Sequence, residues 1–267
     1  MYLPRQFDHR DPAVTCRLLR EHPLASLIST DDQGFPFVSH LPIKLDQVGH
    51  DGMPLILLGN LAKPNPQVQH LAQRPEVLLS FLGPHAFMST RVYPDEQRVP
   101  TWNYLAVQVR VRVRLLQGEE AKDAMLKQLI ADHDPPYAKQ WRSLPEKYTH
   151  GMLAAISAFE FSVVDILTKV KLNQHRPEAH AAMLSTYSQG SPREQEVARW
   201  MQDLGLGSDA HFPKLDVQVL HELGNPVRDG AEILVFQFLA FGRGGTEQGA
   251  AGQAQIDPVF KLVLVDQ

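Results

Sequence analysis

The chain has 267 residues, of which 43% are hydrophobic and 21% charged, a composition typical of a globular protein with a sizeable core. Its 26 Lys and Arg residues against 30 Asp and Glu residues give a net charge of −4, which excludes a global positive field that would attract nucleic acid or an acidic membrane. The single cysteine excludes an internal disulfide, and the longest apolar run is too short to span a bilayer, so we expect a cytoplasmic protein.

The N-terminal third predicts one helix followed by strands. Asp11 and Pro12 are typical of a helix start, and Pro23 ends that helix. Cys16 lies on it and is interpreted as a small buried residue rather than a nucleophile. Three β-rich runs separated by turn residues then predict a meander: 24–30, 35–45 and 55–58.

A short helix carrying Val68 and Leu71 precedes a buried run from Val77 to Phe81, after which Gly83-Pro84 predicts a turn. The dense ring and amide chemistry that follows marks a candidate site. On a strand, Trp102 and Tyr104 would face one way and Thr101 and Asn103 the other. The alternative is that both rings are ordinary core aromatics.

The longest β pattern in the protein continues from there. Val107, Val109, Val111 and Val113 alternate with polar residues, three of which are arginines, so one face is apolar and the other is charged. These arginines could bind an anion, line a subunit interface or face solvent, and we favour solvent or an interface because evenly alternating charge is typical of any half-exposed strand. A helix is then expected over Glu119–His133, ending before two prolines, and a strand over 153–164.

The last part of the chain is polar at first and then β-rich. Pro177 starts a helix, and Ser191 with Glu194 forms the capping-box pattern that starts another. Beyond it, the strand-like runs are 215–223, 232–241 and 259–265, with a glycine-rich loop at 242–255. This segment is either a small β element or a poorly ordered tail.

Taken together, five motifs closely resemble the PaiB family of FMN-binding negative transcriptional regulators, which are related to pyridoxamine-phosphate-oxidase-like split barrels. They are GPHAFMS from Gly83, VPTWNY from Val99, SHLPIK from Ser39, NPQ from Asn65 and KLNQHR from Lys171. The resemblance covers about residues 1–204. It implies an α+β fold, an antiparallel split β-barrel with flanking helices of the FMN-binding type, in a homodimer with FMN at or near the subunit interface. We therefore expect a split-barrel domain over 1–204 and an extension over 205–267.

The resemblance also implies site residues. Lys63, Asn65 and Arg176 would meet the phosphate or ribityl chain, since a phosphate needs cationic and hydrogen-bonding donors held in place. Trp102 and Tyr104 would pack the flavin ring. The polar partners would be Thr101, Asn103 and Gln174. Without the resemblance, Lys63 could equally be a solvated loop lysine, and a polar linker would be the preferred interpretation of 171–176. Asn60 departs from the histidine common in the family, which puts a role for that side chain in doubt.

No catalytic signature is present in the sequence: it contains no P-loop, GxSxG, HExxH or CxxC motif, and its 12 histidines lack metal-ligand spacing. A flavin carries its own redox reactivity, so a flavin-dependent NAD(P)H reductase or oxidase on the same fold is the alternative to a transcriptional regulator. A small-molecule or haem-binding module is a third reading. Direct DNA binding is unsupported, because no helix-turn-helix is evident and the net charge is negative.

Overall fold

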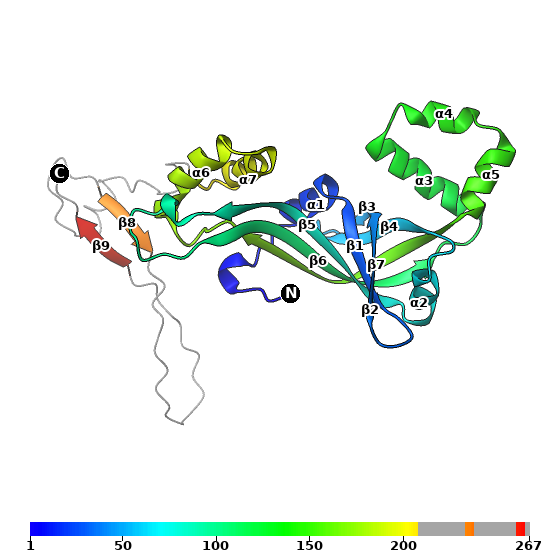
Figure 1. Ribbon diagram of the computed structural model, residues 1–267, viewed down its shortest axis with the longest axis horizontal. Helices are drawn as coiled ribbons and strands as arrows, with labels where there is room; N and C mark the ends of the chain where they lie inside the picture. The colour runs from blue at the N-terminus through cyan, green and yellow to red at the C-terminus, as the bar shows by residue number, and fades with distance from the viewer. Residues whose placement is uncertain (208–232, 238–259, 265–267) are drawn as a thin grey trace, which may run out of the picture. The chain divides into compact units, whose positions relative to one another are not determined.

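The computed structural model describes residues 1–207, 233–237 and 260–264 (Figure 1). The chain divides into two compact units, residues 1–206 and 207–267. In the first unit, Figure 1 shows α3–α5 beyond one end of a long sheet and α6–α7 over the other end. None of the helices among the described residues is both long and apolar enough to cross a membrane.

The first unit is built on a seven-stranded antiparallel sheet with the order β2-β1-β5-β6-β7-β4-β3. Its strands are β1 (Leu24–Thr30), β2 (Pro36–Pro42), β3 (Lys44–Val48), β4 (Pro54–Ala62), β5 (Glu76–Met88), β6 (Thr101–Leu115) and β7 (Ile156–Lys171). The long strands β5, β6 and β7 form its centre, so they carry both the core and the outward face of the sheet.

The two edge strands β2 and β3 are consecutive in the chain and separated by Ile43 alone. β2 pairs with β1 and β3 pairs with β4, so the sheet must curl until its two edges approach each other at Ile43. The α+β split barrel is confirmed. The three-stranded meander was wrong, because the run predicted as one strand over 35–45 breaks at Ile43 and serves opposite edges of the sheet.

The helices of the first unit are α1 (Pro12–Glu21), α2 (Gln67–Gln73), α3 (Glu119–His133), α4 (Tyr137–Ser143), α5 (Glu146–Ala154), α6 (His180–Ser188) and α7 (Pro192–Asp203). Single 3₁₀ turns lie at η1 (Arg5–Phe7), η2 (Thr90–Val92) and η3 (Pro177–Ala179). The expected caps are confirmed: the Asp11 carboxylate accepts the amide of Ala13 at 2.8 Å, and Ser191 and Glu194 form a capping box.

The expected turn at Gly83-Pro84 was wrong, because β5 continues through these residues with an irregular register between Leu82 and His85. The glycine is needed here for close packing. A Cβ atom at Gly83 would lie 2.8 Å from Leu18 Cδ2 and 3.2 Å from the Leu105 carbonyl oxygen. Gly83 therefore lets α1 approach the inner face of the sheet.

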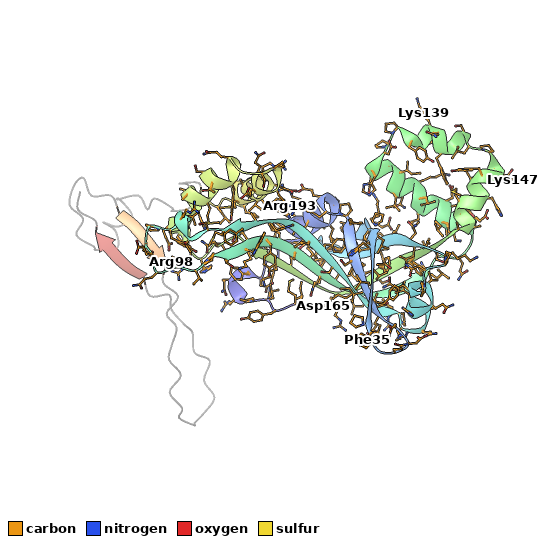
Figure 2. The ribbon with its side chains drawn as sticks, viewed as in Figure 1. Phe35, Arg98, Lys139, Lys147, Asp165 and Arg193 are labelled. Carbon is orange, nitrogen blue, oxygen red and sulfur yellow. The ribbon has the colours of Figure 1, made fainter. Side chains whose placement is uncertain are left out.

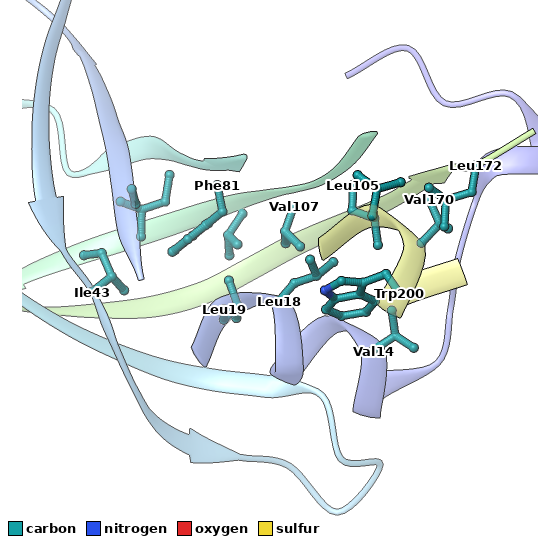
Figure 3. Close-up of a cluster of buried hydrophobic side chains, with 14 of the residues drawn as sticks. Val14, Leu18, Leu19, Ile43, Phe81, Leu105, Val107, Val170, Leu172 and Trp200 are labelled. Carbon is teal, nitrogen blue, oxygen red and sulfur yellow. The ribbon is translucent and has the colours of Figure 1, made fainter. Parts of the chain in front are cut away.

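The core lies between the inner face of the sheet and helices α1 and α7 (Figure 3). Val107, Val109 and Val111 of β6 are at most 1% exposed, and Leu18 of α1 and Trp200 of α7 are equally buried. The alternation predicted for β6 is confirmed, as are the helix over Glu119–His133 and the burial of Cys16. The arginines of β6 face solvent, where Arg112 pairs with Glu76 and Arg114 with Glu160.

In the second unit, two of the expected strand-like runs form an antiparallel pair, β8 (Ile233–Gln237) and β9 (Phe260–Leu264). The run predicted over 215–223 and the glycine-rich loop lie outside the described residues.

Candidate functional site

The loop after β4 carries the first two predicted site residues. Asn65 holds the loop: its Oδ1 accepts the Gln67 amide at 2.9 Å and its Nδ2 donates to Ser39 Oγ at 3.0 Å on β2. The Lys63 amide donates to the Ala155 carbonyl oxygen at 2.8 Å, while its side chain is exposed. Gln67 is buried and donates from Nε2 to oxygens of β1 and β2. The loop is therefore held by hydrogen bonds to β1, β2 and Ala155, and the Lys63 ammonium group makes no ion pair in the part of the chain that the structure describes.

The start of β6 turns Asn103 toward the interior of the sheet. This residue is fully buried, and its Nδ2 donates to the Tyr187 hydroxyl at 3.0 Å. Its Oδ1 has no hydrogen-bond partner among the described residues. Burial raises the pKa of Tyr187 to about 12, so this hydroxyl stays protonated and donates to the Phe87 carbonyl oxygen at 3.2 Å. The Asn103–Tyr187 pair thus ties β6, β5 and α6 together.

The two aromatic residues of this segment face outward, as the alternation predicts. Trp102 is 53% exposed and contacts the rings of Phe87 and His85 at centroid distances of 5.9 and 6.2 Å. Trp102 is therefore not a core aromatic. Tyr104 is half-buried, with the ammonium groups of Lys169 and Lys171 at 5.2 and 5.8 Å from its ring centroid.

Beyond β7, the chain turns through Asn173, whose φ of 60° lies in the left-handed region. Gln174 holds this turn with both ends of its amide, accepting the Leu172 amide and donating to the Val170 carbonyl oxygen. Arg176 is partly exposed, with Glu178 at 3.9 Å. The last residue of β7, Lys171, donates to Thr101 Oγ1 at 2.6 Å and joins this turn to β6.

A cavity of about 620 Å³ lies where η1, the loop before β6 and the turn after β7 meet. Three predicted residues line it: Thr101, Asn103 and Arg176. Its other polar lining residues are Gln6, Tyr93, Glu96, Gln97, Arg98, Lys171, Asn173 and His175. The size is in the range of small-molecule sites. Burial and the neighbouring Arg176 lower the pKa of His175, so the neutral imidazole is favoured.

Lys63 and Asn65 do not lie with the other six predicted residues. The Lys63 loop adjoins the first residue of β7, where Ala62 pairs with Ile156, whereas Tyr104 pairs with Lys171 at the other end. The 16 residues of β7 span about 50 Å. Figure 2 shows Arg98, beside the second group, at the end of the unit opposite to Lys139 and Lys147. Within one chain, the predicted residues form two separate groups.

Two residues beside the second group were not singled out in the sequence, Lys169 and Tyr187, whereas Lys171 opens the KLNQHR motif. The two lysines occupy outward positions of β7 on either side of the buried Val170, and this polar–apolar alternation is present in the sequence. Nothing in the sequence indicated that the ammonium groups of both lysines would lie over the ring of Tyr104. Nor did it indicate that Tyr187 would form a hydrogen bond with Asn103, 84 residues earlier in the chain.

Residues 1–165 match the protein-family model described as "Putative FMN-binding domain". The chain is 29% identical to "Protease synthase and sporulation protein PAI 2" of Bacillus subtilis (strain 168), covering 76% of this chain and 97% of that protein. It is 24% identical to the uncharacterized protein AN0679 of Emericella nidulans, in a match that covers 65% of this chain and 84% of that protein. The flavocytochrome Anf3 of Azotobacter vinelandii superposes with a TM-score of 0.53 at 16% identity over 64% of this chain and 73% of that chain, which shows the fold alone.

The family model matches more than half of the chain, and the match to the relative from Bacillus covers nearly the full length of that relative. The resemblance read from the five sequence motifs is thereby confirmed, as is FMN as the cofactor. The chain belongs to the PaiB-type family of FMN-binding domains.

Proposed function

We propose that two copies of this chain bind FMN between them, with the Lys63 loop of one copy and the Trp102 segment of its partner completing each site. The observation that carries this proposal is the separation of the predicted residues along β7. A strand of 16 residues is far longer than FMN, so a single chain cannot bring both groups to one cofactor. A two-fold axis brings opposite ends of two identical chains together.

The Lys63 loop fits the phosphate of FMN. Among the described residues, no carboxylate pairs with the exposed Lys63 ammonium group, so it is free to bind an anion. Asn65 is already held by two hydrogen bonds, and the loop therefore needs little ordering when the ligand arrives. A phosphate with nearly two negative charges gains most from a cation on such a fixed loop.

The β6 segment fits the ring system. Trp102 offers an exposed flat surface and Tyr104 a half-buried one, both on the outward face. In the proposed site, Thr101 and Arg176 contact the ribityl chain or phosphate. Asn103 and Gln174 are the polar partners that hold β6 and the following turn in position, since their amides bond within the chain.

The outward face of the sheet supports a second copy as the partner. Five large apolar side chains on this face are 48–67% exposed: Leu24, Val38, Leu82, Phe87 and Trp102. Leu24, Leu82, Phe87 and Trp102 each have a buried neighbour along the strand, and Val38 pairs with Ile28 on β1, so the outward direction follows from the alternation. An apolar patch of this kind on a soluble chain is typical of an interaction surface.

A complementation experiment tests the shared site. Lys63→Ala and Trp102→Ala are purified separately, mixed under conditions that exchange subunits, and titrated with FMN by flavin fluorescence. In a mixed dimer, one site combines both defects and the other combines both intact halves. Random exchange makes about half of the dimers mixed, so FMN binding should return at about one quarter of the wild-type number of sites. Lys139→Ala, an exposed change on α4, is the control that should bind like wild type.

If the site lay within one chain, mixing would restore nothing, because every chain would carry a defect. That result, with both variants folded and dimeric, contradicts the proposal.

We further propose that the FMN-bound dimer is a negative transcriptional regulator. The support is the relative from Bacillus subtilis, which is named a protease synthase and sporulation protein. The test is retardation of DNA fragments from the protein's own genome by the FMN-bound form. Saturable, sequence-dependent retardation supports regulation. Rapid anaerobic bleaching of the flavin by NADH or NADPH, with turnover and no retardation, would instead assign a flavin-dependent enzyme.

A further inference from the structure

Two lysines on the outward face of β7 share one aromatic ring. The ammonium groups of Lys169 and Lys171 lie within 6 Å of the Tyr104 ring centroid. Lys169 is only 7% exposed. Their hydrogen-bond partners among the described residues are uncharged: Lys169 donates to the Tyr2 carbonyl oxygen, and Lys171 donates to Thr101 Oγ1 and the Trp102 carbonyl oxygen.

This arrangement leaves two positive charges without a counter-charge in a partly desolvated place. Burial lowers the pKa of Lys171, and the neighbouring Lys169 lowers it further. Buried charges in proteins are normally paired, because an unpaired charge is costly to desolvate. An anion between or beside the two ammonium groups would remove that cost.

The 620 Å³ cavity opens beside Lys171 and gives an anion room to bind. Its charged lining residues are Glu96, Arg98, Lys171 and Arg176. Arg98 is already neutralised by Asp95 at 2.7 Å, and Glu178 lies between the two arginines at 3.5 and 3.9 Å. Lys171 is the lining cation that has no carboxylate within ion-pair distance in the described part of the chain.

We propose that this cavity binds a small organic dianion, a phosphate monoester or a dicarboxylate, at a site separate from the flavin phosphate. Lys171 binds the anionic group, and the neighbouring Lys169, whose ammonium group lies over the same Tyr104 ring, supplies the second positive charge. Two uncompensated cations match a dianion better than a monoanion. The inference rests on the proposed function, which places the flavin phosphate at the Lys63 loop, and the second test distinguishes the two sites.

The first test uses the wild-type protein saturated with FMN. Trace acetic anhydride labels exposed amines, and mass spectrometry measures the acetylation rate of each lysine with glycerol 3-phosphate, succinate or chloride present. We expect glycerol 3-phosphate, succinate or both to slow acetylation of Lys171 at least about fivefold, with Lys139 unaffected. The comparison of the two probes identifies which dianion is preferred. No protection, or equal protection by chloride at the same ionic strength, overturns the proposal.

The second test uses calorimetry on Lys171→Met, with Lys139→Met as the control. The binding constant for the protecting dianion should fall about tenfold or more in Lys171→Met, while that for FMN changes less than about twofold. If Lys171→Met weakens FMN and the dianion together, the lysine pair belongs to the flavin phosphate and a separate site is excluded. Circular dichroism checks folding, and the labelling result stands without the variant.

Discussion

The hydroxyl of Tyr187 holds the start of β6, and its removal should destabilise the first unit measurably. Tyr187 is 1% exposed, accepts a hydrogen bond from Asn103 Nδ2 at 3.0 Å and donates one to the Phe87 carbonyl oxygen at 3.2 Å. In Tyr187→Phe, both bonds are lost while the ring volume stays. The buried Asn103 amide, whose Oδ1 already has no partner among the described residues, would then be left without any.

Each lost bond costs about 1 kcal/mol, and leaving a buried donor unsatisfied brings the total to about 2–3 kcal/mol. We expect urea unfolding, followed by circular dichroism, to show that loss of free energy of unfolding with an unchanged m value. Tyr148→Phe, at an exposed tyrosine of α5, is the control and should change stability by less than about 0.5 kcal/mol. A loss below about 0.5 kcal/mol in Tyr187→Phe would refute the assignment of these hydrogen bonds.

Three further predictions concern stability. The folded state holds the Tyr187 proton to about pH 12, whereas the unfolded state releases it near pH 10. Wild type should therefore lose about 3 kcal/mol more stability between these pH values than Tyr187→Phe does, measured by urea unfolding across that range. Burial lowers the pKa of His22, so as the pH falls the unfolded state binds a proton at this residue before the folded state does. Stability should therefore fall as the pH drops below about 6.5, and His22→Gln should flatten this dependence. An unchanged slope of stability against pH in His22→Gln would contradict the prediction. Gly59→Ala would put a Cβ atom 2.8 Å from Ile43 Cδ1 and should lower the free energy of unfolding by about 1–3 kcal/mol. Gly151→Ala, at a position of α5 where no atom lies within 4 Å of the new Cβ, should raise the free energy of unfolding by about 0.5–1 kcal/mol. Thermal unfolding measures both changes, and a higher midpoint for Gly59→Ala than for Gly151→Ala would contradict the packing.

Patterns that depend on neighbouring residues were predictable from the sequence. The valine alternation of β6 sets its inner face, and the Asp11 and Ser191 caps start their helices, because each feature uses residues within one element. The family motifs likewise identified the split barrel and its cofactor before any contact was known.

Features that depend on distant pairing were not predictable in this way. The β-rich run around Ile43 reads as one strand, and only its pairing with β1 on one side and β4 on the other shows that it divides. Gly83-Pro84 reads as a turn, yet the approach of Leu18 makes the glycine part of a continuous strand. The importance of Lys171 depends on which carboxylates are near it, and sequence spacing does not give that information.

The most direct test of the account is a fluorescence titration of wild type and Lys63→Ala with FMN and with riboflavin, which lacks the phosphate. The account predicts that wild type binds FMN at least about tenfold more tightly than riboflavin, and that Lys63→Ala loses this preference while binding riboflavin as wild type does. Equal binding of the two flavins by wild type, or a preference for FMN that survives in Lys63→Ala, would contradict a phosphate anchored at the Lys63 loop.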